Sequence, residues 1–311
     1  MYRIVPAPVL GLLGFILVCL NLAFWGTVFF FVALPKLLPA GSVRRRTTRR
    51  LLRVKDLWSM GNNAIFDLLL DVRWEIEDLE GLEPDGRYVI IANHQSWLDI
   101  PVIQRGLAAR ISPFKFFIKR QLMWAPIVGQ AAWALDFPFM KRHSREALAK
   151  RPELRVEDLE TTRKSLRYFG KDPESILNFM EGTRFSREKH DQQSPPWRHL
   201  LNPKSGGVAY VLGTVGYRLN GIVDATIVYP PGEGKVFWRF LQGKIGWIHL
   251  TVRRRDVPSE YASEASWSDS STRRAFQKWI RDVWTEKDEL IQRVLSEKST
   301  DLRSPGSDAT A

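Results

Sequence analysis

A histidine and an aspartate five residues apart could form a catalytic pair in this chain. His94 lies two residues after the end of the apolar run 88–92, and Asp99 lies five residues further on. An aspartate that accepts a hydrogen bond from one imidazole nitrogen leaves the other nitrogen free to act as a general base. This spacing does not place two side chains on one helix face, so the pair requires a corner between a strand and a helix. On chemistry alone, a structural hydrogen bond is the better explanation of such a pair.

A second polar segment follows another apolar run, at residues 176–179. It begins with Glu181, and Gly182 permits a tight turn. Thr183 and Arg184 then offer hydrogen-bond donors to an anion, and a guanidinium group can hold two phosphate oxygens at once. Taken alone, the segment is an ordinary polar turn. In combination with the histidine and aspartate, it favours a site that handles an anionic substrate.

Short apolar runs alternate with longer helical patterns beyond residue 74, which is typical of an α/β domain with a largely central sheet. Strands are expected at 88–92, 115–118, 136–140, 176–179, 223–229 and 247–252. Helices are expected at about 98–105, 121–133, 144–169 and 205–219, and a loop that contains a Pro-Pro pair at 186–204. Because open α/β sheets bind ligands at the carboxyl edge of their strands, His94 lies where a site is expected.

An uncharged apolar segment from residue 4 to residue 35 is expected to anchor the chain in a membrane. Residues 15–34 alone provide about the twenty apolar residues that cross a bilayer core. The segment is longer than one perpendicular helix requires, so it forms either one tilted span or two short helices that turn near Asn21 or Gly26. A cleaved signal peptide would have a much shorter apolar region.

Basic residues are concentrated just after this apolar segment. Only Arg3 precedes it, whereas a basic cluster follows it, consisting of Arg44, Arg45, Arg46, Arg49, Arg50, Arg53 and Lys55. This asymmetry predicts that the C-terminal side lies in the cytoplasm, and the cluster suits anionic lipid headgroups. The whole chain has a net charge of +12, which suits an acidic membrane or nucleic acid. The 12 Trp and 17 Phe residues favour the membrane surface.

The chain is therefore expected to have five parts. These are a membrane anchor at 1–40, a basic interfacial helix at 41–75, the α/β domain at 76–257, a linker and amphipathic C-terminal helix at 258–298, and a disordered tail at 299–311. The interfacial helix is predicted over 44–72 from the helical spacing of its apolar residues. The single cysteine, Cys19, excludes an internal disulfide and a cysteine-based zinc site. The histidines lack the spacing of metal ligands, so no metal is expected.

The two polar segments together resemble the motifs of the 1-acylglycerol-3-phosphate acyltransferase family. The family's Asn-His-(four residues)-Asp motif stands here as N-H-Q-S-W-L-D at 93–99, and its Glu-Gly-Thr-Arg motif stands as E-G-T-R at 181–184. Between them, the family's Lys-x-x-Leu…Pro-x-x-Gly stretch is matched by Lys119, Leu122, Pro126 and Gly129, and its Phe-Ile-x-Arg pattern by Phe139, Met140, Lys141 and Arg142. The segment 204–207 is similar to a basic and glycine-containing segment that follows the third motif. The resemblance spans roughly residues 85 to 230.

One segment departs from the family's pattern. The family's fourth motif usually carries a proline in a Val-Pro-Val-type strand, whereas residues 222–229 read I-V-D-A-T-I-V-Y. This form is more similar to the subgroup that contains lysocardiolipin-type acyltransferases and their bacterial relatives. The departure concerns the choice of substrate and leaves the reaction class unchanged.

The resemblance implies a glycerolipid acyltransferase-like domain, with a central mixed sheet flanked by helices. It implies transfer of a fatty acyl chain from acyl-CoA or acyl-carrier protein to the free hydroxyl of a lysophospholipid, with 1-acylglycerol-3-phosphate giving phosphatidate. His94 would take the hydroxyl proton while Asp99 orients the imidazole ring. The residues implied to bind substrate are Glu181, Gly182, Thr183, Arg184, Arg142 and Lys119. No cofactor is implied beyond the acyl thioester.

The expected location is a bacterial inner membrane, with the catalytic domain on the cytoplasmic side. Expected partners are the lysophospholipid, the acyl thioester, anionic membrane lipids and, as one donor, acyl-carrier protein. The alternatives are an enzyme that remodels another lysophospholipid, such as lysophosphatidylglycerol, or a catalytically silent lipid-binding homologue. The apolar N-terminus argues against a nucleic-acid-binding protein, and no nucleic acid is expected as a partner.

Overall fold

Six strands of this chain form one sheet in the order β1-β8-β7-β2-β6-β3, as seen in a computed structural model. The structure describes residues 5–38, 41–119, 123–124, 128–137, 139–140, 174–263, 267 and 269–301. The strands are β1 (Arg73–Glu77), β2 (Tyr88–Ala92), β3 (Phe114–Phe116), β6 (Ser175–Phe179), β7 (Gly221–Val228) and β8 (Trp247–Arg255). Neighbouring strands are parallel, except that β7 and β8 are antiparallel. The expected mixed central sheet is therefore confirmed.

The most apolar runs form the middle of the sheet. All residues of β2 and β7 are buried, as expected for strands covered by helices on both faces. The strands predicted at 88–92 and 176–179 are confirmed, and those at 223–229 and 247–252 are confirmed with shifted ends. The strand β1 was missed, and it shows that the expected boundary between residues 75 and 76 is wrong, because the sheet begins at Arg73.

The predicted strands at 115–118 and 136–140 are only partly correct. Phe114–Phe116 joins the main sheet, whereas β4 (Ile118–Lys119) pairs in parallel with β5 (Phe139–Met140) as a separate two-stranded sheet. The chain cannot be extended at Asp136, because this residue has a left-handed φ of 56°, two residues after the end of a helix. That helix is α4 (Val128–Ala134), the described part of the helix predicted at 121–133.

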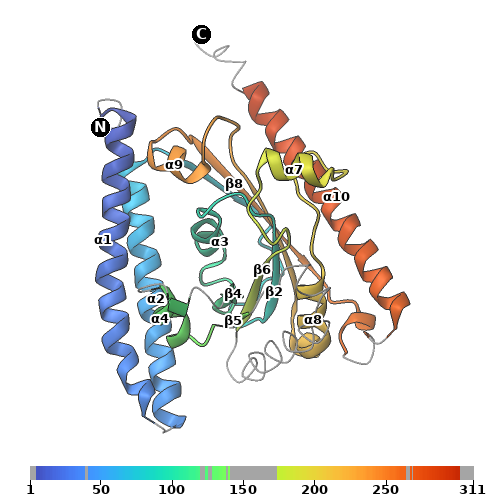
Figure 1. The fold of residues 1–311 in the computed structure, drawn as a ribbon, viewed down its shortest axis with the longest axis horizontal. Coiled ribbons are helices and arrows are strands. Elements are labelled where there is room, and N and C mark those ends of the chain that lie inside the picture. The colour runs from blue at the N-terminus through green and yellow to red at the C-terminus, as the bar shows by residue number, and fades with distance from the viewer. Residues whose placement is uncertain are drawn as a thin grey trace, which may run out of the picture.

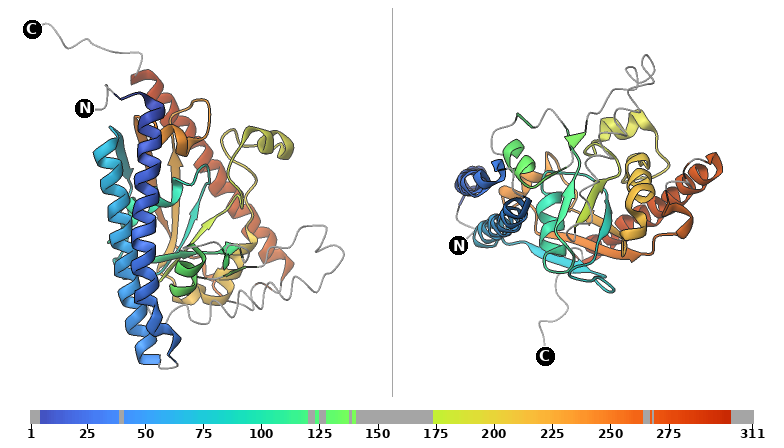
Figure 2. Two further views of the ribbon diagram at one scale, coloured as in Figure 1. Left: turned by 60° about the vertical axis from the view of Figure 1, so that its left-hand side comes forward. Right: turned by 90° about the horizontal axis from the view of Figure 1, so that it is seen from below.

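Helices cover both faces of the sheet (Figures 1 and 2). The helices α3 (Asp99–Leu107) and α9 (Val236–Leu241) pack on one face, together with the N-terminal helices. The helices α8 (Gly206–Val215) and α10 (Ser270–Asp301) pack on the other. In β7, Val223, Ala225 and Ile227 face the α3 side, whereas Ile222 and Val228 face the α10 side.

The N-terminal segment forms a long helical hairpin (Figure 1). Helix α1 (Ala7–Ala33) is continuous and leads through a 3-10 turn, η1 (Leu34–Leu37), into helix α2 (Gly41–Leu69), which packs against it. Of the two alternatives for the apolar segment, the continuous helix is therefore observed, and the pair of short helices that turns near Asn21 or Gly26 is not. The Asn21 amide instead donates to Asn62 Oδ1 at 2.9 Å and to the Trp58 carbonyl at 3.1 Å on α2. The stretch Ala7–Leu37 is long and apolar enough to cross a membrane, as judged by length and composition only.

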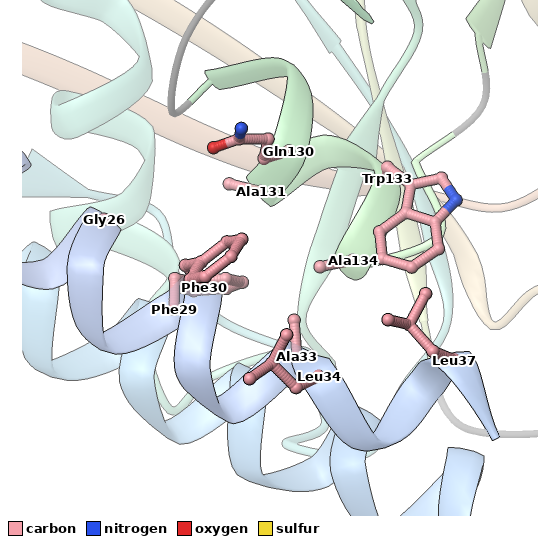
Figure 3. A pocket seen from close by; sticks show the side chains of 10 residues that line it. All are labelled: Gly26, Phe29, Phe30, Ala33, Leu34, Leu37, Gln130, Ala131, Trp133 and Ala134. Atoms are coloured by element: carbon pink, nitrogen blue, oxygen red, sulfur yellow. The ribbon is translucent and has the colours of Figure 1, made fainter.

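Helix α4 packs against the end of α1, and an apolar pocket of about 140 Å³ lies between them (Figure 3). Phe30 and Leu34 line it from the hairpin, and Trp133 lines it from α4. Beside this contact, buried Lys36 bonds Asp136 Oδ2 at 2.7 Å, and Arg44 bonds Asp136 Oδ1 at 2.6 Å. These ion pairs join the hairpin to the segment after α4.

Several other predictions have a clear outcome. The loop expected at 186–204 contains a helix, α7 (Arg187–Gln193), because the Ser186 hydroxyl caps it by accepting from the Lys189 N–H group. The helices at 98–105 and 205–219 are confirmed as α3 and as α8 followed by η3 (Gly216–Arg218). The C-terminal helix continues through Asp301, past the expected boundary at 298, and the linker contains a short helix, η4 (Ser259–Tyr261). The helix predicted at 144–169 lies outside the described residues.

Candidate active site

The site begins where β2 ends. There the Asn93 side chain replaces the backbone hydrogen bonds that a longer β2 would make to β7. The Asn93 amide donates to the Ile227 carbonyl at 2.9 Å, and its Oδ1 accepts from the Ile227 N–H group at 2.9 Å. A carboxamide has both a donor and an acceptor, so it can satisfy both backbone groups of a buried strand residue. The backbone can therefore leave the sheet at His94 without leaving β7 unpaired.

Asp99 is the first residue of α3 and lies fully buried against His94. The distance from His94 Nδ1 to Asp99 Oδ2 is 2.7 Å. The same oxygen accepts from the backbone N–H groups of Gln95 at 2.7 Å and Ser96 at 2.9 Å. Because an ionised carboxylate only accepts, Nδ1 carries the hydrogen, and Nε2 keeps the lone pair that a general base needs.

Phe179, the last residue of β6, supports the histidine ring. The two ring centroids are 4.0 Å apart and the planes differ by 17°, which is a stacked arrangement. The His94 side chain is 19% exposed to solvent. The imidazole is thus fixed by Asp99 and Phe179, yet an edge remains accessible to a substrate.

Glu181 lies behind the histidine and is buried, with 1% of its surface exposed. Its Oε1 accepts from the His94 backbone N–H group at 3.2 Å. Burial above all, together with the negative charge of Asp99, raises the pKa of this carboxyl from 4.5 to about 8, although hydrogen bonds from the backbone N–H groups of His94 and Leu201 lower it. Below that pH the side chain is neutral and serves as a structural link between the two polar segments.

The turn after Glu181 gathers cationic side chains. Gly182 has a φ of 67°, and a Cβ atom there would lie 3.0 Å from Lys204 Cδ, so the lysine stem packs on the turn. Lys189 Nζ donates to Thr183 Oγ1 at 2.8 Å and to the Arg184 carbonyl at 2.9 Å. The turn is therefore held by two lysines that lie outside the E-G-T-R segment.

The two predicted motifs meet at this turn. The Arg184 guanidinium lies over the Trp97 ring, 4.8 Å from its centroid. The Phe185 N–H group donates to the His94 carbonyl at 2.7 Å. Arg184 is exposed, so its side chain is accessible to a ligand. The structure thus brings together all the predicted residues from positions 94 to 99 and 181 to 184.

A buried charge cluster supports the same part of the sheet from the α10 side. Lys287 Nζ lies 2.5 Å from Asp224 Oδ1, and it donates to the Ala225 carbonyl at 2.8 Å and to Thr226 Oγ1 at 2.9 Å. Burial lowers the pKa of Lys287, and the charge of Asp224 partly offsets this. Arg255 bonds the other Asp224 oxygen at 2.9 Å. Three consecutive residues of β7 are thereby tied to the C-terminal helix.

Sequence reasoning missed three residues that shape the site, Trp97, Lys189 and Tyr229, and it noted Lys204 only as part of the segment 204–207. Tyr229 stands at the end of the strand that departs from the family's pattern, and its hydroxyl donates to Asp99 Oδ1 at 2.7 Å. Of the other two residues implied to bind substrate, Lys119 lies in the separate β4 strand, and Arg142 lies outside the described residues. Their roles stay predictions.

Comparisons with known proteins show what this chain is similar to. The acyltransferase family model matches residues 73–230. Mouse 1-acyl-sn-glycerol-3-phosphate acyltransferase gamma is 26% identical over 166 residues, covering 49% of this chain and 41% of that protein. The lyso-ornithine lipid O-acyltransferase of Pseudomonas aeruginosa is 25% identical over 254 residues, covering 80% of this chain and 83% of that protein. The chain spans about half the length of the mammalian relatives, matching 41% of the mouse protein and 48% of the bovine delta protein.

The fold is also similar to a solved structure. The crystal structure of the 1-acyl-sn-glycerophosphate acyltransferase PlsC from Thermotoga maritima superposes with a TM-score of 0.51 at 18% identity. The match covers 94% of this chain and 96% of that chain, so it includes the helical hairpin as well as the sheet.

Proposed function

This chain belongs to the acyltransferase family, and we propose that it transfers a fatty acyl chain from a thioester to the free hydroxyl of a lysolipid with an anionic headgroup. The observation that carries this proposal is the 2.7 Å contact between His94 Nδ1 and Asp99 Oδ2 beside the cationic turn at Arg184. The contact leaves Nε2 as a base, and the turn supplies positive charge for the headgroup of the acceptor.

The reaction proceeds by direct attack of the acceptor. His94 Nε2 takes the proton of the lysolipid hydroxyl as its oxygen bonds to the thioester carbonyl carbon. Collapse of the tetrahedral intermediate breaks the C–S bond, and the leaving thiolate receives the proton from the imidazolium. Ser96 supports a mechanism without an acyl-enzyme, because it is buried and its hydroxyl oxygen accepts from the Leu98 N–H group at 3.2 Å.

The acceptor that we favour is 1-acylglycerol-3-phosphate, which gives phosphatidate. Arg184 and Lys189 support this choice, since a guanidinium and an ammonium group suit the two charges of a phosphate monoester. A second candidate is a lyso-ornithine lipid, favoured by the relative that matches 80% of this chain over 83% of its own length. An ornithine headgroup presents a carboxylate, which the same cations can bind. Acyl-CoA and acyl-carrier protein are both candidate donors.

We further propose that the hairpin lies in one leaflet of a membrane, with the sheet on the cytoplasmic side. Helix α2 packs along α1 and carries exposed arginines at 44–46, 49, 50 and 53. Placing such residues at the bilayer centre costs about 2.5–3.5 kcal/mol each, which disfavours a spanning arrangement of this hairpin. The exposed apolar face of α1, which includes Leu12, Ile16 and Phe24, would enter the acyl region. The arginines would then contact anionic headgroups.

A panel assay tests this function. Purified protein in mixed micelles would be supplied with lysophosphatidate, lysophosphatidylglycerol or lyso-ornithine lipid, and with acyl-CoA or acyl-carrier protein as donor. We expect His94→Ala to lose at least about a hundredfold in kcat, as expected for removal of a general base. His199→Ala is the matched control, because that ring bonds Gln292 on α10 at 2.9 Å, outside the site. Failure of the wild-type protein to acylate any lysolipid would refute the proposal.

A further inference from the structure

The end of β7 extends past its partner strand toward the catalytic pair. The parallel register of β2 and β7 ends with Ala92 opposite Ala225. Beyond that point the Asn93 side chain takes over the pairing with Ile227. Side chains alternate along a strand, so Tyr229 faces the same side of the sheet as Ile227, which is the side that carries α3. The register of β7 against β2 therefore places Tyr229 beside the N-terminus of α3.

Tyr229 makes one specific polar contact there. Its hydroxyl donates to Asp99 Oδ1 at 2.7 Å, and the residue is buried, with 5% of its surface exposed. Burial and the neighbouring carboxylate raise the pKa of Tyr229 well above its ordinary value. The phenol therefore keeps its proton and acts as a donor.

The two carboxylate oxygens of Asp99 accept hydrogen bonds from different groups. Oδ2 accepts from the His94 ring and from the backbone N–H groups of Gln95 and Ser96. Oδ1 accepts from Tyr229. We propose that Tyr229 is a positioning residue, which holds the Asp99 carboxylate in the plane that the His94 ring requires for acyl transfer. This inference rests on the proposed function, and it gives a role to the strand that departs from the family's pattern.

The tyrosine also affects the charge that the imidazole experiences. A hydrogen bond from a neutral phenol stabilises the carboxylate charge, which would otherwise be fully available to an imidazolium. Among the described residues, Glu181, after β6, also interacts electrostatically with Asp99, and Lys287 of α10 interacts with Glu181. Loss of the phenol should therefore strengthen the attraction between the Asp99 carboxylate and the imidazolium that forms during the reaction. The base-catalysed step would then begin at higher pH.

The variant Tyr229→Phe tests this role, because it removes one oxygen and retains the ring. We expect kcat to fall by about tenfold to a hundredfold, as for loss of a hydrogen bond to a charged group, and KM to stay within about twofold. We also expect the acidic limb of the pH profile of kcat to move upward by about half a pH unit or more. Tyr88→Phe is the matched control, since its hydroxyl is a buried acceptor for the Glu83 N–H group at 3.1 Å, at the start of β2.

The possible outcomes separate this inference from the proposed function. A wild-type profile for Tyr229→Phe, with His94→Ala inactive, would overturn the role of Tyr229 and leave the function intact. Equal losses in Tyr229→Phe and Tyr88→Phe, with no displacement of the pH profile, would assign the tyrosine a purely structural role and would also overturn the inference. A wild-type protein that acylates no lysolipid would refute the function itself. A loss of kcat together with the displaced acidic limb, found in Tyr229→Phe alone, would support the inference.

Discussion

Glu181 should make the stability of this protein fall as the pH rises from acid to mildly alkaline. Its carboxyl has an ordinary pKa of 4.5 and a folded-state pKa of about 8. Between these values the folded state keeps a proton that the unfolded state has released, so the free energy of unfolding decreases with pH. At about 1.4 kcal/mol for each pH unit, the full decrease is about 5 kcal/mol. The stabilisation that Glu181 gives to the folded state is fully present below pH 4.5 and is lost as the pH rises through 8.

The variant Glu181→Gln isolates this contribution. Glutamine has nearly the same shape, and its oxygen can still accept from the His94 backbone N–H group, but it cannot ionise. We expect the variant and the wild-type protein to have similar stability at pH 5. At pH 9 we expect the variant to be more stable by several kcal/mol, which corresponds to a rise in Tm of about 10 °C.

Thermal unfolding in detergent at pH 5, 7 and 9 would measure the difference. Glu188→Gln is the matched control, because Glu188 is a fully exposed carboxyl on the nearby helix α7. Hydrogen bonds from its own backbone N–H group and from the Ser186 hydroxyl lower the pKa of Glu188, so this variant should show no gain in stability over the wild-type protein at pH 9. Parallel curves for Glu181→Gln and the wild-type protein would refute the reasoning, since they would mean that the buried carboxyl titrates alike in the folded and unfolded states.

Three further predictions concern stability. Lys287→Met should lower the free energy of unfolding by about 3 kcal/mol, because it leaves a buried carboxylate short of one cation; an unchanged midpoint in urea would contradict this. Asp136→Asn should also lower the free energy of unfolding by about 3 kcal/mol, because buried Lys36 would lose its counter-charge. Thermal unfolding of the variant and the wild-type protein would measure this loss. Asn21→Leu should cost about 1 kcal/mol by removing the hydrogen bonds between α1 and α2. Hydrogen exchange should then quicken in the middle of α2, and unchanged exchange would count against the contact.

The central strands were predictable because they are continuous apolar runs between turn signals. The run Y-V-I-I-A is confirmed as β2, with every residue buried. The strand β1 was missed although Trp74 and Ile76 alternate with charged residues, because the helical pattern before it led directly into this short segment. Asn21 was one of two turn positions in the alternative with two short helices, whereas its amide is satisfied by Asn62 of α2, 41 positions further along the chain. Local sequence does not reveal such distant partners.

The candidate site was predictable as far as its motifs are local. The spacing of His94 and Asp99 requires a corner between a strand and a helix, and the structure has one between β2 and α3. The contact between Trp97 and Arg184 depends on the pairing of β2 with β6, and that of Tyr229 with Asp99 on the pairing of β2 with β7. These registers are set by the whole sheet, so the spacing of residues within one motif could not predict them.

The register of β7 has a consequence for how this chain can evolve. One side of the strand meets the catalytic pair through Tyr229, and the opposite side binds Lys287 through Asp224 and Thr226. An insertion or deletion of one residue between 224 and 229 would reverse the side to which each following side chain points. Such a change would remove the tyrosine from Asp99 and would also disturb the attachment of the C-terminal helix. Substitutions can accumulate in this strand one at a time, but its length is constrained by chemistry and stability together.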